Sequence, residues 1–284
     1  MVKTDKISTF DVLNYGFFTI FGLLMLYPIW YVLMFSLSDP SHIALNSYYL
    51  IPNGFSLESY KQVLGESIVY SGYKNSIIVT GVGTLISLIL TGMTAYPLSR
   101  EQLPGKKLFF MYIMFTMIFH GGMIPTYLII RSLGLLDSLW ALMLPAAINV
   151  YNLLIMIKFF KNIPESLIES AKIDGYNDIQ ILFKIIVPLS TAAFAAVGLF
   201  YAVFNWNSFL SGMMYITSNT KWPLQVVLRD LLMQSQSAES GDSRISTETF
   251  KMATVIVTIL PILMVYPYLQ KYFVKGVMLG SVKG

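Results

Sequence analysis

Six stretches of the chain, each 18 to 24 residues long, are predominantly apolar and contain no aspartate, glutamate, lysine or arginine. They are residues 14–35, 75–98, 108–130, 139–157, 189–210 and 252–269. An α-helix needs about 20 apolar residues to cross the hydrocarbon core of a bilayer. The strands of membrane β-barrels are about 10 residues long and alternate in polarity, which these stretches do not. The pattern therefore predicts an all-α, polytopic membrane protein with six transmembrane helices.

All 34 charged residues lie outside these stretches, although they make up only 12% of the 284 residues. The net charge of +4 is too small and too dispersed for a surface that follows a nucleic-acid backbone. The chain has no cysteine, which excludes disulfides, thiolate zinc sites and cysteine nucleophiles. We expect no metal and no nucleic-acid partner.

Lysine and arginine are distributed unevenly between the two sides that six spans would define. With both termini on one side, that side carries 12 of these residues and the other carries 7 over longer loops. Positive side chains accumulate on the cytoplasmic side, so both termini are expected there. The expected parts are a cytoplasmic N-terminus (1–13), a transmembrane domain (14–272) with external loops 36–73 and 211–249 and a cytoplasmic loop 158–188, and a cytoplasmic tail (273–284).

The charge-free stretches also limit how the protein can be powered. A transporter driven by an ion gradient usually has ionisable groups inside its spans, and here the only such residue besides tyrosines is His120, which has no partner carboxylate. No G-x-x-x-x-G-K-[ST] sequence for binding nucleotide phosphates occurs. No span combines a nucleophile with a base, so we expect no catalysis. If the chain transports a solute, its energy must come from another subunit.

The cytoplasmic loop 158–188 has the pattern of two short amphipathic helices. Pro164 suits the first turn of a helix that ends near Asp174, and Gly175 is expected to stop it with a positive φ. Asn177 or Asp178 can cap the second helix. The apolar faces of these helices could pack under their own bundle or dock in a groove of a partner protein.

The same loop resembles that of binding-protein-dependent ABC importers. Their motif reads E-A-A-x-x-x-G, then nine residues, then I-x-L-P. The corresponding positions here are Glu169, Ser170, Ala171, Asp174, Gly175, Ile185 and Pro188. The spacing matches in full, and the departures are Ser170 for the first Ala and Val187 for Leu.

Further segments resemble the carbohydrate branch of that family, the MalG- and LplC/YtcP-like permeases. They are L-G-L-L-D-S at 133–138, N-W-N-S-F-L at 205–210, R-E-Q-L-P-G-K-K at 100–107 and the ending G-S-V-K-G at 280–284. The resemblance implies the type I importer permease fold in the bacterial plasma (inner) membrane, import of an oligosaccharide such as an acidic one, and a loop that couples to an ATPase. It also implies a second, non-identical permease subunit, two ATP-binding cassette subunits and an extracytoplasmic solute-binding protein. The tail residues Val282, Lys283 and Gly284 would contact the ATPase dimer.

A sugar pathway needs hydrogen-bonding groups and aromatic faces in apolar walls. The candidates are Asn149, Tyr151, Asn152, Asn205, Trp206 and Asn207. These side chains could instead bond between helices or anchor the chain at the membrane interface. The polar stretch 234–244 of the second external loop is expected to be mobile, as a tether or as a contact for the binding protein.

Two other functions remain open at this point. One is an ABC permease for a solute other than a sugar. The other is a membrane channel or scaffold that needs no ATPase.

Overall fold

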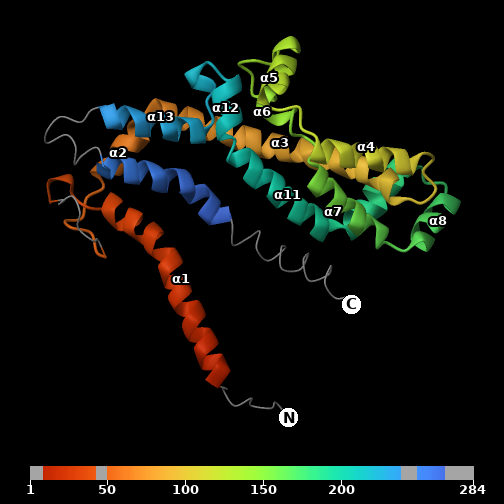
Figure 1. Cartoon of the computed structure of the whole chain (residues 1–284), viewed down its shortest axis with the longest axis horizontal. Coiled ribbons are helices and arrows are strands. Elements are labelled where there is room, and N and C mark those ends of the chain that lie inside the picture. Colours follow the sequence, from red (N-terminus) through yellow and green to blue (C-terminus); the bar gives the residue numbers. More distant parts are fainter. Residues whose placement is uncertain (1–8, 43–49, 238–247, 266–284) are drawn as a thin grey trace. The chain divides into compact units, whose positions relative to one another are not determined.

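The computed structural model describes residues 9–42, 50–237 and 248–265, and it consists of helices and their connections (Figure 1). Within these ranges the one β-type contact is an isolated antiparallel bridge between Ser38 and Phe55. The prediction of an all-α protein is therefore confirmed for the part of the chain that the structure describes.

The elements follow one another as α1 (Thr9–Ser36), η1 (Pro40–His42), α2 (Glu58–Gly65), α3 (Ser67–Ser99), α4 (Lys106–Ile118), α5 (Met123–Ser132), α6 (Trp140–Met143), α7 (Val150–Lys161), α8 (Glu165–Ile173), α9 (Asp178–Ile181), η2 (Leu182–Ile186), α10 (Val187–Leu189), α11 (Thr191–Trp206), α12 (Phe209–Tyr215), η3 (Asn219–Lys221) and α13 (Leu224–Ser237). A last described helix covers Glu248–Val265.

Three of these helices, α1, α3 and Glu248–Val265, are each long and apolar enough to cross a membrane. Two bent pairs raise the number to five if each pair is one span: α4 with α5, and Asp178–Leu189 with α11. All five coincide with predicted apolar stretches. Because the fourth stretch yields no such helix among the described residues, the total of six spans stays a prediction.

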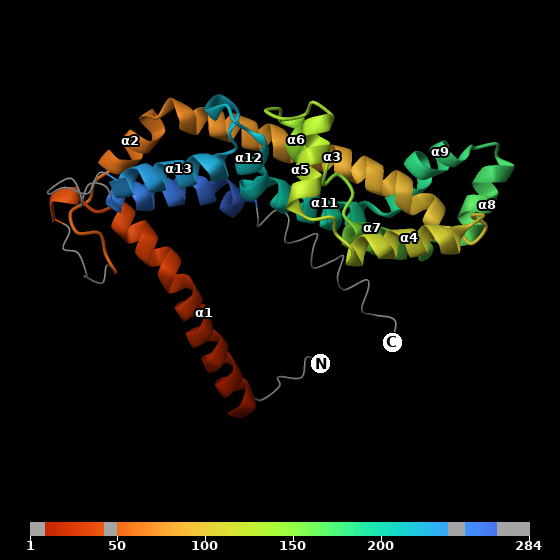
Figure 2. The same ribbon diagram turned by 45° about the horizontal axis from the view of Figure 1, so that its top comes forward.

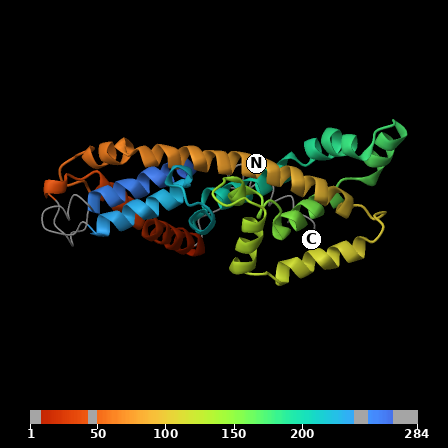
Figure 3. The ribbon, with the colours of Figure 1, turned by 90° about the horizontal axis from the view of Figure 1, so that it is seen from above.

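The predicted spans 108–130 and 139–157 are each interrupted. The stretch 108–130 bends by 112° between α4 and α5, so that the two helices meet at an angle (Figure 3). His120 lies in this bend, and Pro125 follows in the first turn of α5. The stretch 139–157 contains α6 and α7 separated by a non-helical segment that includes Pro145. Proline cannot donate the hydrogen bond that would continue a helix through these points.

The predicted external loops contain helices within the residues that the structure describes. The loop 36–73 contains α2 and the first turns of α3, and the loop 211–249 contains α12, η3 and α13. The polar stretch 234–244 was expected to be mobile, but its first residues belong to α13, which ends at Ser237. The rest of that stretch lies outside the described residues.

The chain divides into two compact units. The first contains described residues of Met1–Glu66 and Leu228–Leu260, and the second those of Ser67–Val227 and Pro261–Gly284. In the first unit, Met34 and Phe35 at the end of α1 pack with Met252. The hydroxyls of Ser36 and Tyr60 lie 2.6 Å apart and join α1 to α2. The other side chains of α1 are largely exposed, as expected of a helix that faces lipid or another subunit.

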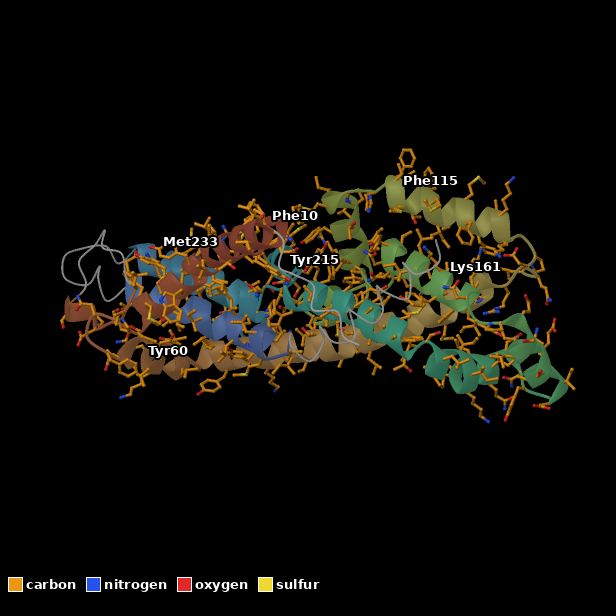
Figure 4. All side chains as sticks on the ribbon, turned by 90° about the horizontal axis from the view of Figure 1, so that it is seen from below. Phe10, Tyr60, Phe115, Lys161, Tyr215 and Met233 are labelled. Carbon is orange, nitrogen blue, oxygen red and sulfur yellow. The ribbon has the colours of Figure 1, made fainter. Side chains whose placement is uncertain are left out.

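The second unit is organised around α3, which packs along α11 and α7 (Figure 1). At Gly83 of α3, a Cβ atom would stand 2.9 Å from Nδ2 of Asn205 and 3.2 Å from Cγ of Met143. The small residue thus allows α3 and α11 to approach closely, as small residues do at helix contacts in membrane proteins. On the periphery, Phe115 of α4 points away from the other helices (Figure 4).

Candidate functional site

The loop 158–188 folds as two short helices at the end of α3 (Figure 2). Pro164 is the N-cap of α8, with Glu165 in the first turn and Lys172 in the last, so both charges complement the helix dipole. Gly175 follows with a φ of 84°. Because an L-residue in the left-handed region costs about 1–2 kcal/mol, this turn favours glycine. The predicted helix stop with positive φ at Gly175 is confirmed.

A capping box starts the second helix of the loop. The side-chain oxygen of Asn177 accepts a hydrogen bond from the backbone N–H of Gln180 at 2.9 Å. The side-chain oxygen of Gln180 accepts one from the N–H of Asn177 at 3.0 Å. Of the two predicted caps, the structure therefore uses Asn177. The helix then widens into the π-helical turn η2 before Pro188, which has no N–H to donate to a preceding carbonyl.

Each helix of the loop has one buried and one exposed apolar face. The buried side chains belong to the same core as Tyr96 and Phe160 and are Ile168, Ala171, Ile181, Leu182 and Ile186. The exposed ones are Leu167, Ile173, Tyr176, Ile179 and Phe183, which we call the exposed loop face. Ile173 is 87% exposed. The loop therefore packs under its own bundle, as one of the two interpretations predicted, and it also presents a second apolar surface. Docking of that surface in a partner's groove stays a prediction.

The motif positions lie on both sides of this loop. Ala171 is buried in the core, whereas Glu169 is exposed. The hydroxyl of Ser170 donates to the carbonyl oxygen of Ser166 at 2.8 Å, so the departure from alanine leaves the helix intact. Asp174 is the exposed C-cap of α8. Towards the end of the loop, Ile185 is half-buried and Pro188 is exposed.

The side chains of Tyr96, Arg100 and Asp178 join α3 to the loop, and none of the three was predicted as a site residue. The hydroxyl of Tyr96 donates to Oδ1 of Asp178, the first residue of α9, at 3.3 Å. The guanidinium carbon of Arg100 lies 5.3 Å from the centroid of the Tyr96 ring. Nη2 of Arg100 donates to the carbonyl oxygen of Phe160 in the last turn of α7 at 3.1 Å. The sequence signals at Arg100 were its place two residues after the apolar stretch 75–98 and at the start of the segment 100–107.

Burial of Arg100 lowers its pKa, and the nearby Tyr96 and Glu165 oppose that shift. An arginine remains protonated at neutral pH in spite of such a shift. Its charge therefore stands at the junction of α3, α7 and the loop. A cavity of about 360 Å³ lies at the same junction, and it is lined by Tyr96, Arg100, Glu165, Lys172, Asp178 and neighbouring residues.

Three of the six pathway candidates share one pocket. Asn149, Tyr151 and Asn152 come from the start of α7, after the break that separates it from α6. The pocket measures about 330 Å³, and its other lining residues are Ala146, Ile148, Phe200, Tyr201 and Phe204. Amide groups and aromatic rings without any charged side chain form a surface that suits a polyhydroxylated ligand. We call it the amide pocket.

Tyr201, which sequence reasoning missed, organises this pocket. Its hydroxyl oxygen accepts a hydrogen bond from the backbone N–H of Asn149 at 3.0 Å. The same hydroxyl is 2.7 Å from the hydroxyl of Thr91, to which it can donate. Tyr201 and Thr91 are both buried. The bridge fixes the broken start of α7 against α3 and α11.

The other three pathway candidates lie elsewhere. Asn205 is buried, with Nδ2 3.4 Å from the hydroxyl of Thr84, and so takes the interhelical role that was the alternative prediction. Nδ2 of Asn207 donates to the carbonyl oxygen of Val203 at 2.8 Å. Trp206 is 8% exposed and borders a separate, apolar cavity of about 290 Å³. The six candidates thus divide among the amide pocket, hydrogen bonds to helices, and a second cavity.

The segment 133–138 is held by the side chain of Asp137. Its Oδ1 accepts hydrogen bonds from the N–H groups of Thr217 and Ser218, and its Oδ2 contacts Lys221. The tail residues Val282, Lys283 and Gly284 lie outside the described residues. No cluster of three or more histidine or acidic side chains that could hold a metal occurs in the described ranges.

The family model for the binding-protein-dependent transport system inner membrane component matches residues 88–279. The chain therefore belongs to this family and is a permease subunit of a binding-protein-dependent ABC importer. The segment covered includes both the loop 158–188 and the amide pocket.

Similar proteins narrow the branch to carbohydrate permeases. The chain is 46% identical to the polygalacturonan/rhamnogalacturonan transport system permease protein YtcP of Bacillus subtilis, across 98% of this chain and 100% of that protein. It is 42% identical to protein LplC of the same organism, across 100% and 98%. A crystal structure of a bacterial ABC transporter involved in the import of the acidic polysaccharide alginate superposes with a TM-score of 0.86. That match has 33% identity and covers 96% of this chain and 99% of the other.

Proposed function

We propose that this chain forms half of the translocation pathway of an ATP-driven importer for an acidic oligosaccharide. Two relatives support the substrate class, because one is named for polygalacturonan and rhamnogalacturonan and the other for alginate. The observation that carries the transport role is the exposed loop face beside the motif residue Glu169, on a chain without a nucleotide-binding sequence.

The topology follows from the spans and the positive residues. Six spans cross the bilayer, both termini lie in the cytoplasm, and the loop 158–188 faces the cytoplasm. The loops 36–73 and 211–249 face outward. The break at the start of α7 then lies within the membrane, where irregular backbone occurs only beside protein or a water-filled route.

The loop 158–188 transmits the conformational change of the ATPase subunits to the transmembrane helices. An ATP-binding cassette subunit holds the exposed loop face in a groove, and the buried face of the same helices passes the movement into the core around Tyr96 and Phe160. Two such ATPase subunits bind ATP and Mg²⁺. Closure of these subunits turns the pathway outward, and hydrolysis resets it, by rigid-body movement.

A second, non-identical permease subunit completes the pathway, and an extracytoplasmic binding protein delivers the sugar. The tail residues Val282, Lys283 and Gly284 contact the ATPase dimer. The amide pocket holds the sugar through Asn149, Tyr151 and Asn152 and through the faces of its aromatic rings. Since no charged side chain lines this pocket, it recognises hydroxyls and rings, and the selection for acidic sugars resides in the other subunits.

The complete importer, with its own partner subunits, tests this proposal in proteoliposomes. We expect ATP-dependent uptake of labelled trigalacturonate that exceeds uptake of neutral arabinotriose at least tenfold. Glu169→Lys is expected to abolish uptake, whereas Glu66→Gln, an exposed site outside the loop, leaves it unchanged. Uptake without ATP, a preference for the neutral sugar, or full activity of Glu169→Lys would each overturn the proposal.

A further inference from the structure

α3 and the loop 158–188 share an apolar core. One hydrogen bond, from Tyr96 to Asp178, also joins them. Leu98, Ile168 and Leu182 belong to the shared core, and the cavity of about 360 Å³ opens beside that core between the end of α3 and helices α8 and α9. Side chains that line a cavity lack packing partners on one side, so polar contacts at its edge add to what holds the loop. The hydrogen bond from Tyr96 to Asp178 links α3 to α9 at the edge of this cavity.

Arg100 holds the donor of that bond in place. Its guanidinium faces the ring of Tyr96, and the same group is bonded to the end of α7 through Phe160. Its Nε is buried and has no hydrogen-bond partner among the described residues. Arg100 therefore contacts α7 through a hydrogen bond and the ring of Tyr96 through its positive charge. It adds a polar link among three segments that already share one apolar core.

The charges around this contact come from both sides of the cavity. Glu165 of α8 and Asp178 of α9 are acidic, and Lys172 of α8 lies 3.9 Å from Oδ1 of Asp178. The side chains of Lys172 and Asp178 are 50% and 72% exposed, so this ion pair is weak and screened by salt. The less exposed Tyr96 and Arg100 are better placed to fix the loop.

From this geometry we infer that Tyr96 and Arg100 form a latch that positions the coupling loop and carries its movement into α3. The latch rests on the proposed function, because it presupposes that the loop 158–188 couples to the ATPase. Arg100 is a positioning residue: it acts on the loop through Tyr96 and Phe160 and touches no substrate. When the loop moves, α3 follows through the Tyr96–Asp178 bond, and α7 follows through Arg100.

The first test measures coupling in the intact, reconstituted importer. The readout is ATPase activity with binding protein and sugar divided by activity without them. Loss of one ordinary hydrogen bond corresponds to about a fivefold effect, which we expect for Tyr96→Phe because its acceptor, Asp178, is largely exposed. Arg100→Met is expected to lower the ratio at least as much, and Arg100→Lys, which keeps the charge, to restore part of it. Subunit stoichiometry after purification should be unchanged.

The second test measures the position of the loop. Because the chain has no cysteine, spin labels at Ser166→Cys and Lys107→Cys report the distance between α8 and α4 in a background of cysteine-free partners. We expect a broader distance distribution in Tyr96→Phe and Arg100→Met than in wild type. Tyr112→Phe and Arg131→Lys, at exposed sites, serve as matched controls and should leave the distribution and the ratio unchanged.

The coupling role of the loop and the role of the latch can be refuted separately. If Gly175→Pro and Glu169→Lys leave the ATPase ratio intact, the loop does not couple and the proposed function is wrong. If those variants impair coupling but Tyr96→Phe and Arg100→Met change neither the ratio nor the distance distribution, the latch alone is wrong.

Discussion

Nζ of Lys221 lies 2.8 Å from Oδ2 of Asp137 and 2.7 Å from its backbone carbonyl oxygen, and so joins two segments 84 residues apart. The carboxylate also accepts the N–H and the hydroxyl of Ser218, at 2.8 Å and 2.7 Å. The contact with Lys221, followed by those with Ser218, holds the pKa of Asp137 well below its usual value of 3.8. The connection between α5 and α6 is thereby fixed to the segment around η3.

The depressed pKa predicts how this contact depends on pH. A carboxylate of lowered pKa contributes stability above its usual pKa and loses that contribution as the pH falls through the folded-state value. We expect Asp137→Asn to lower the thermal unfolding midpoint of the purified importer by a constant amount from about pH 8 to 5. The difference from wild type should shrink below pH 3.8. A difference that grows on acidification would contradict the assignment.

A second substitution separates charge from backbone strain at this position. Asp137 has a φ of 56°, a region that asparagine tolerates and alanine does not. Asp137→Ala is therefore expected to lower the midpoint more than Asp137→Asn at pH 7. Equal effects of the two substitutions would show that backbone conformation contributes nothing here.

Gly175 offers a similar comparison within the loop 158–188. Its φ is 84°, and nothing lies within 4 Å of the place where a Cβ would stand, so a side chain meets strain but no clash. We expect transport to fall in the order glycine, asparagine, alanine, with Gly175→Ala costing about 1–2 kcal/mol of loop stability. Protease sensitivity of the loop should follow the same order. If asparagine is as damaging as alanine, lost contact with a partner and not backbone conformation explains the effect.

Tyr201→Phe tests the bridge behind the amide pocket. Removing the hydroxyl leaves the N–H of Asn149 without its acceptor and Thr91 without its partner. An unpaired, buried polar group costs about 1–3 kcal/mol, so the unfolding midpoint should fall. Tyr112→Phe, on the exposed face of α4, is the control and should have no effect. An unchanged midpoint for Tyr201→Phe would mean that the bridge does not support α7.

Two glycines of α3 test the contact with α11. Alanine is favoured over glycine in a helix by about 1 kcal/mol, so Gly81→Ala, which meets nothing within 4 Å, should be neutral or stabilising. Gly83→Ala would press on Asn205 and Met143 and should be destabilising. The unfolding midpoints of Gly81→Ala and Gly83→Ala are measured under the same conditions. Equal midpoints would contradict the close approach of α3 and α11.

The spans were predictable because charge and length decide whether a segment enters a bilayer. Their breaks were harder to place. Pro125 and Pro145 indicate weak points, but whether a helix bends, stops or continues there depends on the neighbours that satisfy the freed backbone groups. Asn149 caps α7, because its side-chain oxygen accepts a hydrogen bond from the N–H of Asn152. The start of α7 at this residue was not predicted from the sequence.

The loop was predicted well because its signals are local. Gly175 and Asn177 act on the residues next to them and have the predicted roles. Pro164 stands one position before the predicted first turn, at the N-cap of α8. The roles of Asn149 and Asn205 could not be separated in this way. Both are asparagines near helix ends, and only their partners, Tyr201 for one and Thr84 for the other, show that one borders a pocket and the other joins helices.

Docking of the exposed loop face on an ATPase subunit is the central claim, and cross-linking tests it most directly. A single cysteine at Ile173, which is 87% exposed, carries a short photoreactive label in the purified importer. A label at Phe115, which is 53% exposed on α4, is the matched control. We predict an ATPase adduct, identified by mass spectrometry, from position 173 and none from position 115. Absence of the adduct at 173, or equal adducts at both positions, would contradict the account.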